Sequence, residues 1–90
     1  MKVFKYQIAV TDSQVIMMPA GAQLLTVQRQ EFGQRQQTCL WALVDPANPA
    51  VHRTICMHGT GHEVTQGGQY LATFQMSELV FHVFDHGEKT

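Results

Sequence analysis

Histidine and cysteine are the residues of this sequence whose types and spacing suit chemistry, because both bind metals and both take part in catalysis. The chain has five histidines and two cysteines. Cys56 lies two residues before His58, so a strand would place both on one face. His58 precedes His62 by four residues, as His82 precedes His86. That spacing forms a metal clamp on a helix, but no helical pattern surrounds either pair. We therefore expect no metal site and no cofactor.

The other potential catalytic groups do not form a recognisable set. Ser13 and Ser77 lie in polar turns, outside the Gly-x-Ser-x-Gly pattern of a serine nucleophile. Both cysteines lie in apolar segments, which favours buried thiols over exposed nucleophiles. The seven acidic residues show no paired arrangement. We expect a protein that is not an enzyme. A third hypothesis, a metal-dependent hydrolase, would use Cys56, His58, His62 or His82.

Residues 59–62, which read Gly-Thr-Gly-His, form the most distinctive loop. Glycines allow backbone N–H groups to turn toward an anion, and the side chains of Thr60 and His62 add donors. Arg53 interrupts an apolar strand face, so it either reaches solvent or pairs with an anion or a carboxylate. Trp41 is either a core residue or a stacking platform for a base. The candidate ligand-binding residues are Arg53, Gly59, Thr60, Gly61, His62 and Trp41. The alternative is that residues 59–62 form only a tight turn.

Length and composition restrict the remaining possibilities. Ninety residues, of which 44% are hydrophobic, indicate one globular domain spanning residues 1–90. A formal net charge of −1 gives no basic excess for tracking duplex DNA, although a small anion would need only one or two cations. No apolar run reaches the roughly 20 residues of a membrane-spanning helix. Burial and ordering free energies nearly cancel at this length, so self-association into a homo-oligomer is expected.

The cysteine content and the N-terminus both favour a cytoplasmic protein. Cys39 and Cys56 are too few for a disulfide framework, and we interpret them as buried thiols in a reducing compartment. A bridge between neighbouring strands is the alternative. The first residues lack the long apolar segment of a secretory signal.

Apolar residues recur with the period of β-strands. Residues 39–44 are apolar on both alternating faces and stop at Asp45-Pro46, which predicts a central strand covered on both sides. The Gln-rich residues 30–37 predict a hairpin loop with Phe32 at its tip, and residues 87–90 predict a loose tail. Further strands are predicted at residues 2–10, 15–18, 24–28, 51–58, 69–76 and 79–84.

Six to seven short, mostly antiparallel strands predict an all-β fold, a small sandwich or barrel. No window combines helical periodicity with a cap at each end. The alternative is an α+β fold with one short helix, in residues 20–25 or 45–50.

Five blocks of the sequence carry a resemblance. In order, they are Met18-Pro19-x-Gly21-Ala22, Leu40-Trp41-Ala42-Leu43-Val44-Asp45-Pro46, Gly59-Thr60-Gly61-His62, Tyr70-Leu71-Ala72-Thr73-Phe74-Gln75 and Val80-Phe81-His82-Val83-Phe84. Together they resemble a family of small single-domain proteins of unknown function from phage genomes and bacterial prophages. Residues 28–37 look longer than is usual in that family. The resemblance implies a phage or prophage origin and a soluble intracellular protein, and it supplies no active-site residues.

These observations favour a non-enzymatic phage or prophage accessory protein that acts by binding. The leading hypothesis is sequestration of an anionic small molecule, such as a linear or cyclic nucleotide immune signal, to counter host defence. The alternative is a protein–protein inhibitor or a virion accessory component. It would dock on a host or phage protein through the loop around Phe32 or through an exposed sheet edge. We expect neither duplex DNA nor a membrane as a partner.

Overall fold

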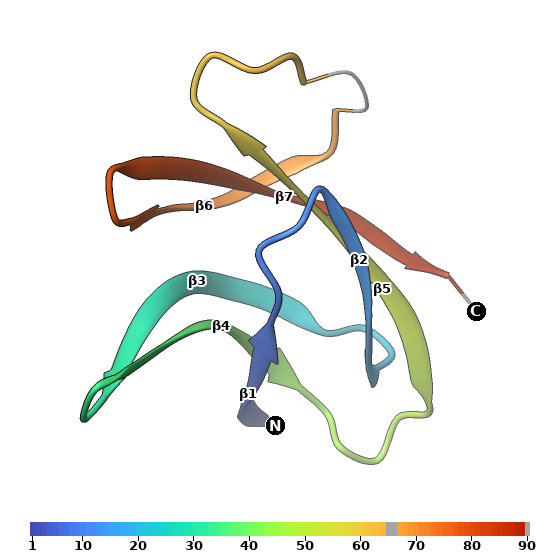
Figure 1. Cartoon of the computed structure of the whole chain (residues 1–90). Helices are drawn as coiled ribbons and strands as arrows, with labels where there is room; N and C mark the ends of the chain where they lie inside the picture. The colour runs from blue at the N-terminus through green and yellow to red at the C-terminus, as the bar shows by residue number, and fades with distance from the viewer. Residues whose placement is uncertain (65–66, 90) are drawn as a thin grey trace.

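The chain folds into two antiparallel β-sheets that face each other (Figure 1). A computed structural model describes residues 1–64 and 67–89, and these contain seven strands and no helix. The three-stranded sheet has the order β1 (Lys2–Ile8), β4 (Arg35–Val44) and β3 (Gln23–Phe32). The four-stranded sheet has the order β2 (Ser13–Pro19), β5 (Ala50–Gly59), β7 (Leu79–Lys89) and β6 (Gln69–Met76). The predicted all-β sandwich is confirmed, and its α+β alternative is wrong.

The predicted central strand is the middle strand of the three-stranded sheet. β4 pairs with β1 on one side and with β3 on the other. Leu40, Ala42 and Val44 direct their side chains into the core, where each is 0% exposed. On the opposite face Cys39 is also buried, but Trp41 and Leu43 are only half-buried. The prediction that both faces are covered is therefore wrong for part of the outer face, where Trp41 and Leu43 stay partly exposed.

The Gln-rich segment is mostly strand rather than loop. β3 continues to Phe32 and β4 begins at Arg35, so only two residues form the turn between them, one of them Gly33 with φ +59°. Polar side chains bond across this hairpin: Gln36 donates to Glu31 at 3.2 Å, and Arg29 donates to Gln36 at 3.2 Å. These cross-strand bonds extend the ladder beyond the predicted strand ends.

The C-terminal segment is also strand. β7 runs to Lys89, so residues 87–89 are not the loose tail that the sequence predicts; Thr90 lies outside the described residues. Glu88 pairs in register with Arg53, and its carboxylate accepts a hydrogen bond from the Gly21 N–H at 3.0 Å. Because these contacts join residues far apart in the sequence, the local pattern of residues 87–89 does not predict them.

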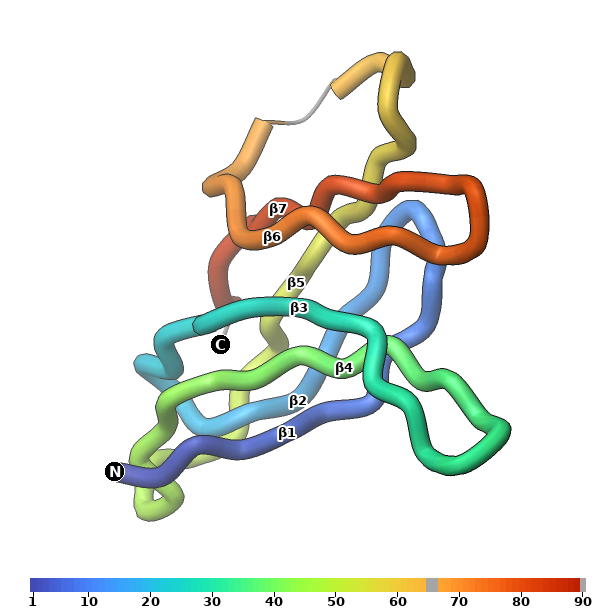
Figure 2. The backbone as a smooth tube through the Cα atoms, turned by 90° about the vertical axis from the view of Figure 1, so that its left-hand side faces the viewer, coloured from blue at the N-terminus to red at the C-terminus, as the bar shows by residue number. Residues whose placement is uncertain are grey.

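The edges of the two sheets meet at β3 and β6 (Figure 2). The other two sheet edges are formed by β1 and β2. None of the described segments forms a helix long and apolar enough to cross a membrane.

Candidate functional site

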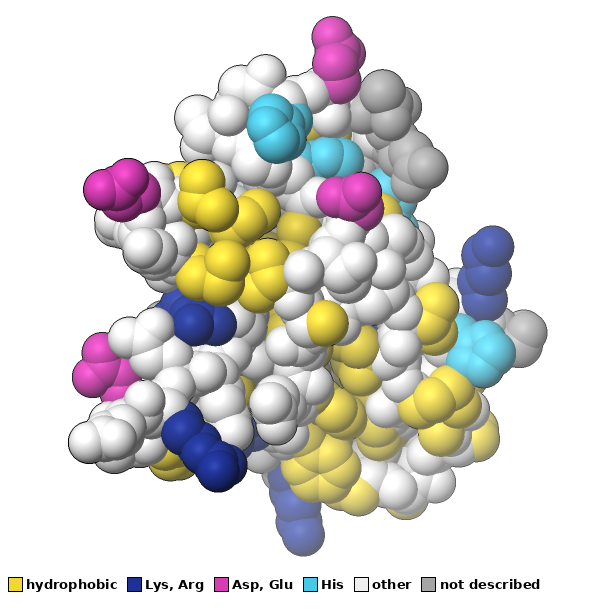
Figure 3. Space-filling model, viewed as in Figure 1, with side chains coloured by type: hydrophobic (Ala, Val, Ile, Leu, Met, Phe, Trp, Pro, Cys, Tyr) yellow, Lys and Arg dark blue, Asp and Glu magenta, His cyan; other side chains and the backbone are white. Residues whose placement is uncertain are grey.

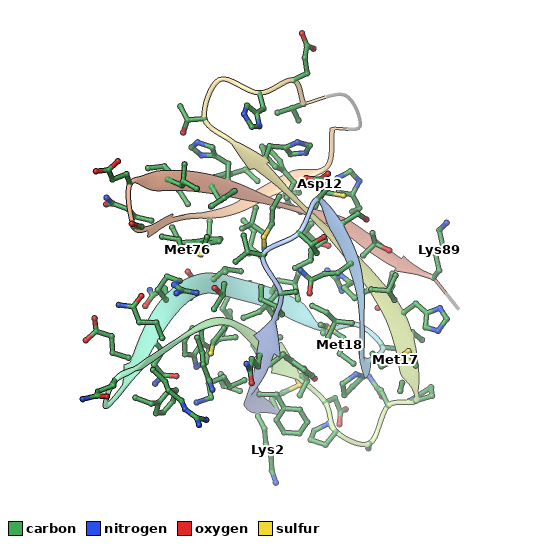
Figure 4. All side chains as sticks on the ribbon, viewed as in Figure 1. Lys2, Asp12, Met17, Met18, Met76 and Lys89 are labelled. Atoms are coloured by element: carbon green, nitrogen blue, oxygen red, sulfur yellow. The ribbon has the colours of Figure 1, made fainter. Side chains whose placement is uncertain are left out.

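A cleft of about 590 Å³ opens at the end of the sandwich, between the β1–β2 turn and the turn that follows β5. In Figure 3, hydrophobic side chains are exposed in a hollow beneath the β6–β7 hairpin, with histidine and acidic side chains nearby. Figure 4 places Asp12 and Met76 on two sides of it. The cleft is lined by Val10, Thr11, Asp12, Ser13, Cys56, Met57, His58, Gly59, His62, Glu63, Met76 and Phe81.

The cleft exists because β2 is shorter than its partner β5. Ser13, the first residue of β2, pairs with Cys56, and the Asp12 carbonyl accepts a hydrogen bond from the Met57 N–H at 3.0 Å. β5 continues to Gly59 without a neighbour on that side. Because backbone groups alternate in direction along a strand, the Gly59 N–H points toward the cleft. The end of β5 therefore supplies an unpaired strand edge as one wall.

The turn after β5 is fixed by glycine. The His62 N–H donates to the Gly59 carbonyl at 3.0 Å, and Gly61 has φ +85°, which together describe a type II turn. A Cβ atom on Gly59 would lie 3.1 Å from the His62 ring. Glycine at position 59 thus lets the imidazole of His62 lie directly against the backbone at the rim of the cleft.

The cleft combines polar rim groups with an apolar floor. Asp12 and Glu63 supply carboxylates, and the Nε2 atom of His58 is buried without a hydrogen-bond partner among the described residues. The His58 ring meets Phe84 edge to face, with centroids 5.7 Å apart. Phe81 belongs to the floor and also to an adjoining hollow of about 350 Å³ that includes Leu79. The two hollows therefore form one amphipathic surface.

The structure does not bring the predicted ligand-binding residues together. Gly59 and His62 line the cleft, and Thr60 lines the adjoining hollow. Gly61 shapes the turn but lines neither. Arg53 lies six residues before Gly59 along β5 and borders a separate hollow of about 310 Å³. Trp41 lies on the outer face of the other sheet, level with Lys5 and Thr26.

Arg53 is held by carboxylates of its own chain. Its Nη2 and Nε atoms donate to the two Asp85 carboxylate oxygens at 2.6 and 3.0 Å, and its Nη1 atom donates to the Ala22 carbonyl at 2.8 Å. Burial by itself would raise the pKa of Asp85, but hydrogen bonds from Arg53 and from the Gly87 N–H hold it below its ordinary value. The sequence allowed Arg53 to reach solvent, to pair with an anion or to pair with a carboxylate, and the structure shows the carboxylate pairing.

Two of the four backbone N–H groups of the Gly-Thr-Gly-His loop are engaged in hydrogen bonds. The Thr60 N–H donates to the Val80 carbonyl at 3.1 Å, and the His62 N–H closes the turn. The Thr60 hydroxyl lies 2.8 Å from Nε2 of His82. A loop in which the Thr60 and His62 N–H groups are already bonded offers fewer donors to an anion. The tight-turn alternative therefore accounts for the backbone of this loop.

His82 lies opposite His58 in the register of β5 and β7, but the other histidines and cysteines add no metal-ligand group among the described residues. His82 bonds through its second ring nitrogen to the Thr73 hydroxyl at 3.0 Å, so both of its nitrogens have partners. Within residues 1–64 and 67–89, no three His, Cys, Asp or Glu side chains gather as metal ligands would. Cys39 and Cys56 are buried in different sheets, and no disulfide joins them.

Sequence reasoning missed the β1–β2 side of the cleft. The sequence indicates only a polar turn around Ser13 and only a strand at residues 79–84, which contains Phe81. What brings them together is the pairing of β2 with β5, which joins residues more than thirty positions apart. The one local sign was the apolar Val10 directly before a polar turn, and that sign is weak.

Comparison with protein families, curated proteins and solved structures places the chain in one family. Neither the curated proteins nor the solved structures include a match. A family model matches residues 1–90, which is the whole chain. The chain therefore belongs to the family described as Domain of unknown function (DUF7352).

Proposed function

We propose that this protein acts by binding, and that it takes a small molecule into the cleft between the β1–β2 turn and the turn after β5. The observation that carries the proposal is the composition of that cleft: an apolar floor around Phe81 and a rim with His58, Asp12 and Glu63. Ligand pockets typically combine an apolar lining with a few convergent polar groups.

The charges of the cleft favour an uncharged or cationic ligand. Asp12 and Glu63 are its fixed charges, and none of the described lining residues is lysine or arginine. A carboxylate a few ångströms from a ligand cation stabilises it by about 1 kcal/mol or more near a protein surface, and it opposes an anion by a similar amount. The chemistry that fits is therefore an aromatic or aliphatic body with a neutral or positively charged polar end.

We further propose that the protein is a phage or prophage accessory protein that sequesters a small molecule in the host cytoplasm. The support for this proposal is the motif resemblance and the presence of a cleft without a catalytic set among the described residues. That the sequestered molecule is a nucleotide immune signal remains a prediction. A base could lie on Phe81, but phosphates would lie near Asp12 and Glu63. We accordingly expect a nucleoside to bind more tightly than its phosphorylated form.

Three aromatic probes of matched size and different charge test the proposal. Calorimetry with benzamidinium, benzamide and benzoate should give affinities in that order, with about tenfold between the cation and the anion. Asp12→Asn should reduce the preference for the cation. Glu31→Gln, at the exposed hairpin tip, is the matched control and should leave the preference unchanged. Adenosine and its phosphates extend the panel. Tightest binding of benzoate, or no binding of any probe at millimolar concentration, would refute the proposal.

A second candidate function rests on the β3–β4 hairpin. Phe32 lies at its end, is 44% exposed, and has the Lys5 ammonium 4.8 Å above its ring. An aromatic residue presented on a projecting hairpin suits docking on a protein. In this form the protein would be an inhibitor or a virion accessory component. A pull-down from infected cells that recovers one stoichiometric protein, lost on Phe32→Ala, would favour it over the cleft.

A further inference from the structure

The free edge of β2 differs from the other free sheet edge, that of β1, in having no charged residue. Edge strands of soluble proteins are usually protected by charged residues, bulges or covering elements. β3 and β6 lie against each other, and β1 carries Lys2 and Lys5. β2 reads Ser-Gln-Val-Ile-Met-Met-Pro, with Pro19 only at its end. The side chains of Val15 and Met17 are 58% and 51% exposed.

The hydrogen-bonding direction of β2 can be derived from its neighbours. The Met57 N–H bonds to the Asp12 carbonyl, and the Ala20 N–H bonds to the Pro49 carbonyl. The register between β2 and β5 is continuous between these two pairs. Even-numbered residues of β2 therefore bond to β5, and odd-numbered residues direct their N–H and C=O groups toward the free edge. Val15 and Met17 thus carry both the exposed apolar side chains and the unpaired backbone groups.

We propose that the β2 edge binds the β2 edge of a second copy, antiparallel, about a two-fold axis at Ile16. This register places Val15 of each copy opposite Met17 of the other. The backbone groups of both residues are then paired, and their side chains form two apolar cross-strand contacts on the outer face. Figure 4 shows Met17 on the side of β2 opposite to the core residue Met18. The two four-stranded sheets would become one continuous sheet.

The absence of charge argues for a second copy as the occupant, and the small contact area sets the expected strength of the dimer. A strand with no charged residue places no like charges opposite each other when it pairs with itself, whereas pairing with β1 would bring in Lys2 and Lys5. A seven-residue strand is only about 23 Å long. Its contact is smaller than the roughly 1,600 Å² of a standard interface. A reversible dimer with a micromolar dissociation constant is therefore expected.

Sedimentation of the full chain from about 10 µM to 1 mM tests this inference. We expect a concentration-dependent dimer, and Val15→Lys should raise its dissociation constant at least tenfold because it places a lysine at the apolar contact. Leu25→Lys is the matched control, since Leu25 is 42% exposed on β3 and lies outside the contact. A chain that is monomeric throughout, or a dimer that folded Val15→Lys leaves intact, would overturn the proposal.

Hydrogen exchange of the unmodified chain gives a second readout that needs no variant to fold. In a monomer the Val15 and Met17 amides face solvent and exchange rapidly; in the proposed dimer both are bonded across the two-fold axis. Their protection should rise with protein concentration, while that of the Ile16 amide, which bonds to β5, should change little. A dimer in which the Val15 and Met17 amides stay unprotected uses another surface and also contradicts the inference.

Discussion

Replacing Asp85 by asparagine removes one partner of the most enclosed ion pair in the described structure. The Arg53 and Asp85 side chains are 11% and 12% exposed, and two hydrogen bonds of 2.6 and 3.0 Å join them. Asparagine keeps the size of the side chain but leaves the guanidinium charge without its main counter-charge. Glu88, whose carboxylate lies 3.7 Å from Nη1 of Arg53, compensates only in part.

The expected loss follows from burial. Removing one partner of a buried pair costs about 3 to 5 kcal/mol, and the remaining Glu88 contact favours the lower end, about 3 kcal/mol. A domain of 90 residues gains about 0.19 kcal/mol/K of entropy on unfolding, so Asp85→Asn should lower Tm by about 15 °C at pH 7. Arg53→Met combined with Asp85→Leu removes both charges and should recover most of this loss.

The pH dependence has a definite sign. The pKa of Asp85 is lowered in the folded state, because the Arg53 and Gly87 hydrogen bonds outweigh the opposing effect of burial. The pair is therefore fully stabilising above the ordinary pKa of 3.8, and its contribution is lost as pH falls below that value. Thermal unfolding followed by circular dichroism should show the Tm difference between wild type and Asp85→Asn narrowing from pH 7 to pH 3. A difference below about 5 °C at pH 7 would show that the pair contributes no more than a surface pair.

Three further predictions concern the turn, the thiols and the core. Gly61→Ala should destabilise the protein by about 1 kcal/mol in urea unfolding, because φ at this position is +85°; an unchanged midpoint would refute the turn assignment. Cys39 and Cys56 should react with a thiol reagent only after unfolding, because both are buried, and rapid labelling of the native chain would contradict this. Leu40→Ala should cost about 3 kcal/mol because Leu40 is 0% exposed, and a loss below about 1 kcal/mol would place it outside the core.

The fold could be predicted from the sequence because its signals are local. Alternation along residues 2–8 and the double-sided apolar run at residues 39–44 each identify a strand. The ends of strands were less predictable. Residues 30–37 and 87–89 are polar and charged, and they join the sheets through cross-strand contacts such as Glu88 with Gly21 that leave no local pattern.

Only one wall of the cleft could be predicted from the sequence. The glycines at 59 and 61 marked a turn, and the structure places Gly59 and His62 at a cleft. The opposite wall depends on the pairing of β2 with β5, which the spacing of residues does not reveal. Arg53 shows a different limit. A cation on an apolar face allowed contact with solvent, an anion or a carboxylate, and the sequence did not identify its partner, Asp85, 32 residues later in the same chain.

Mapping of ligand contacts by nuclear magnetic resonance tests the central claim most directly. Uniformly ¹⁵N-labelled protein titrated with benzamidinium should show its largest amide shift changes at residues 10–13 and 57–63, on both walls of the cleft. The amides near Trp41 and Arg53 should remain nearly unchanged. Shift changes concentrated at Trp41 or Arg53, or spread evenly over the surface, would contradict the assignment of the cleft as the binding site.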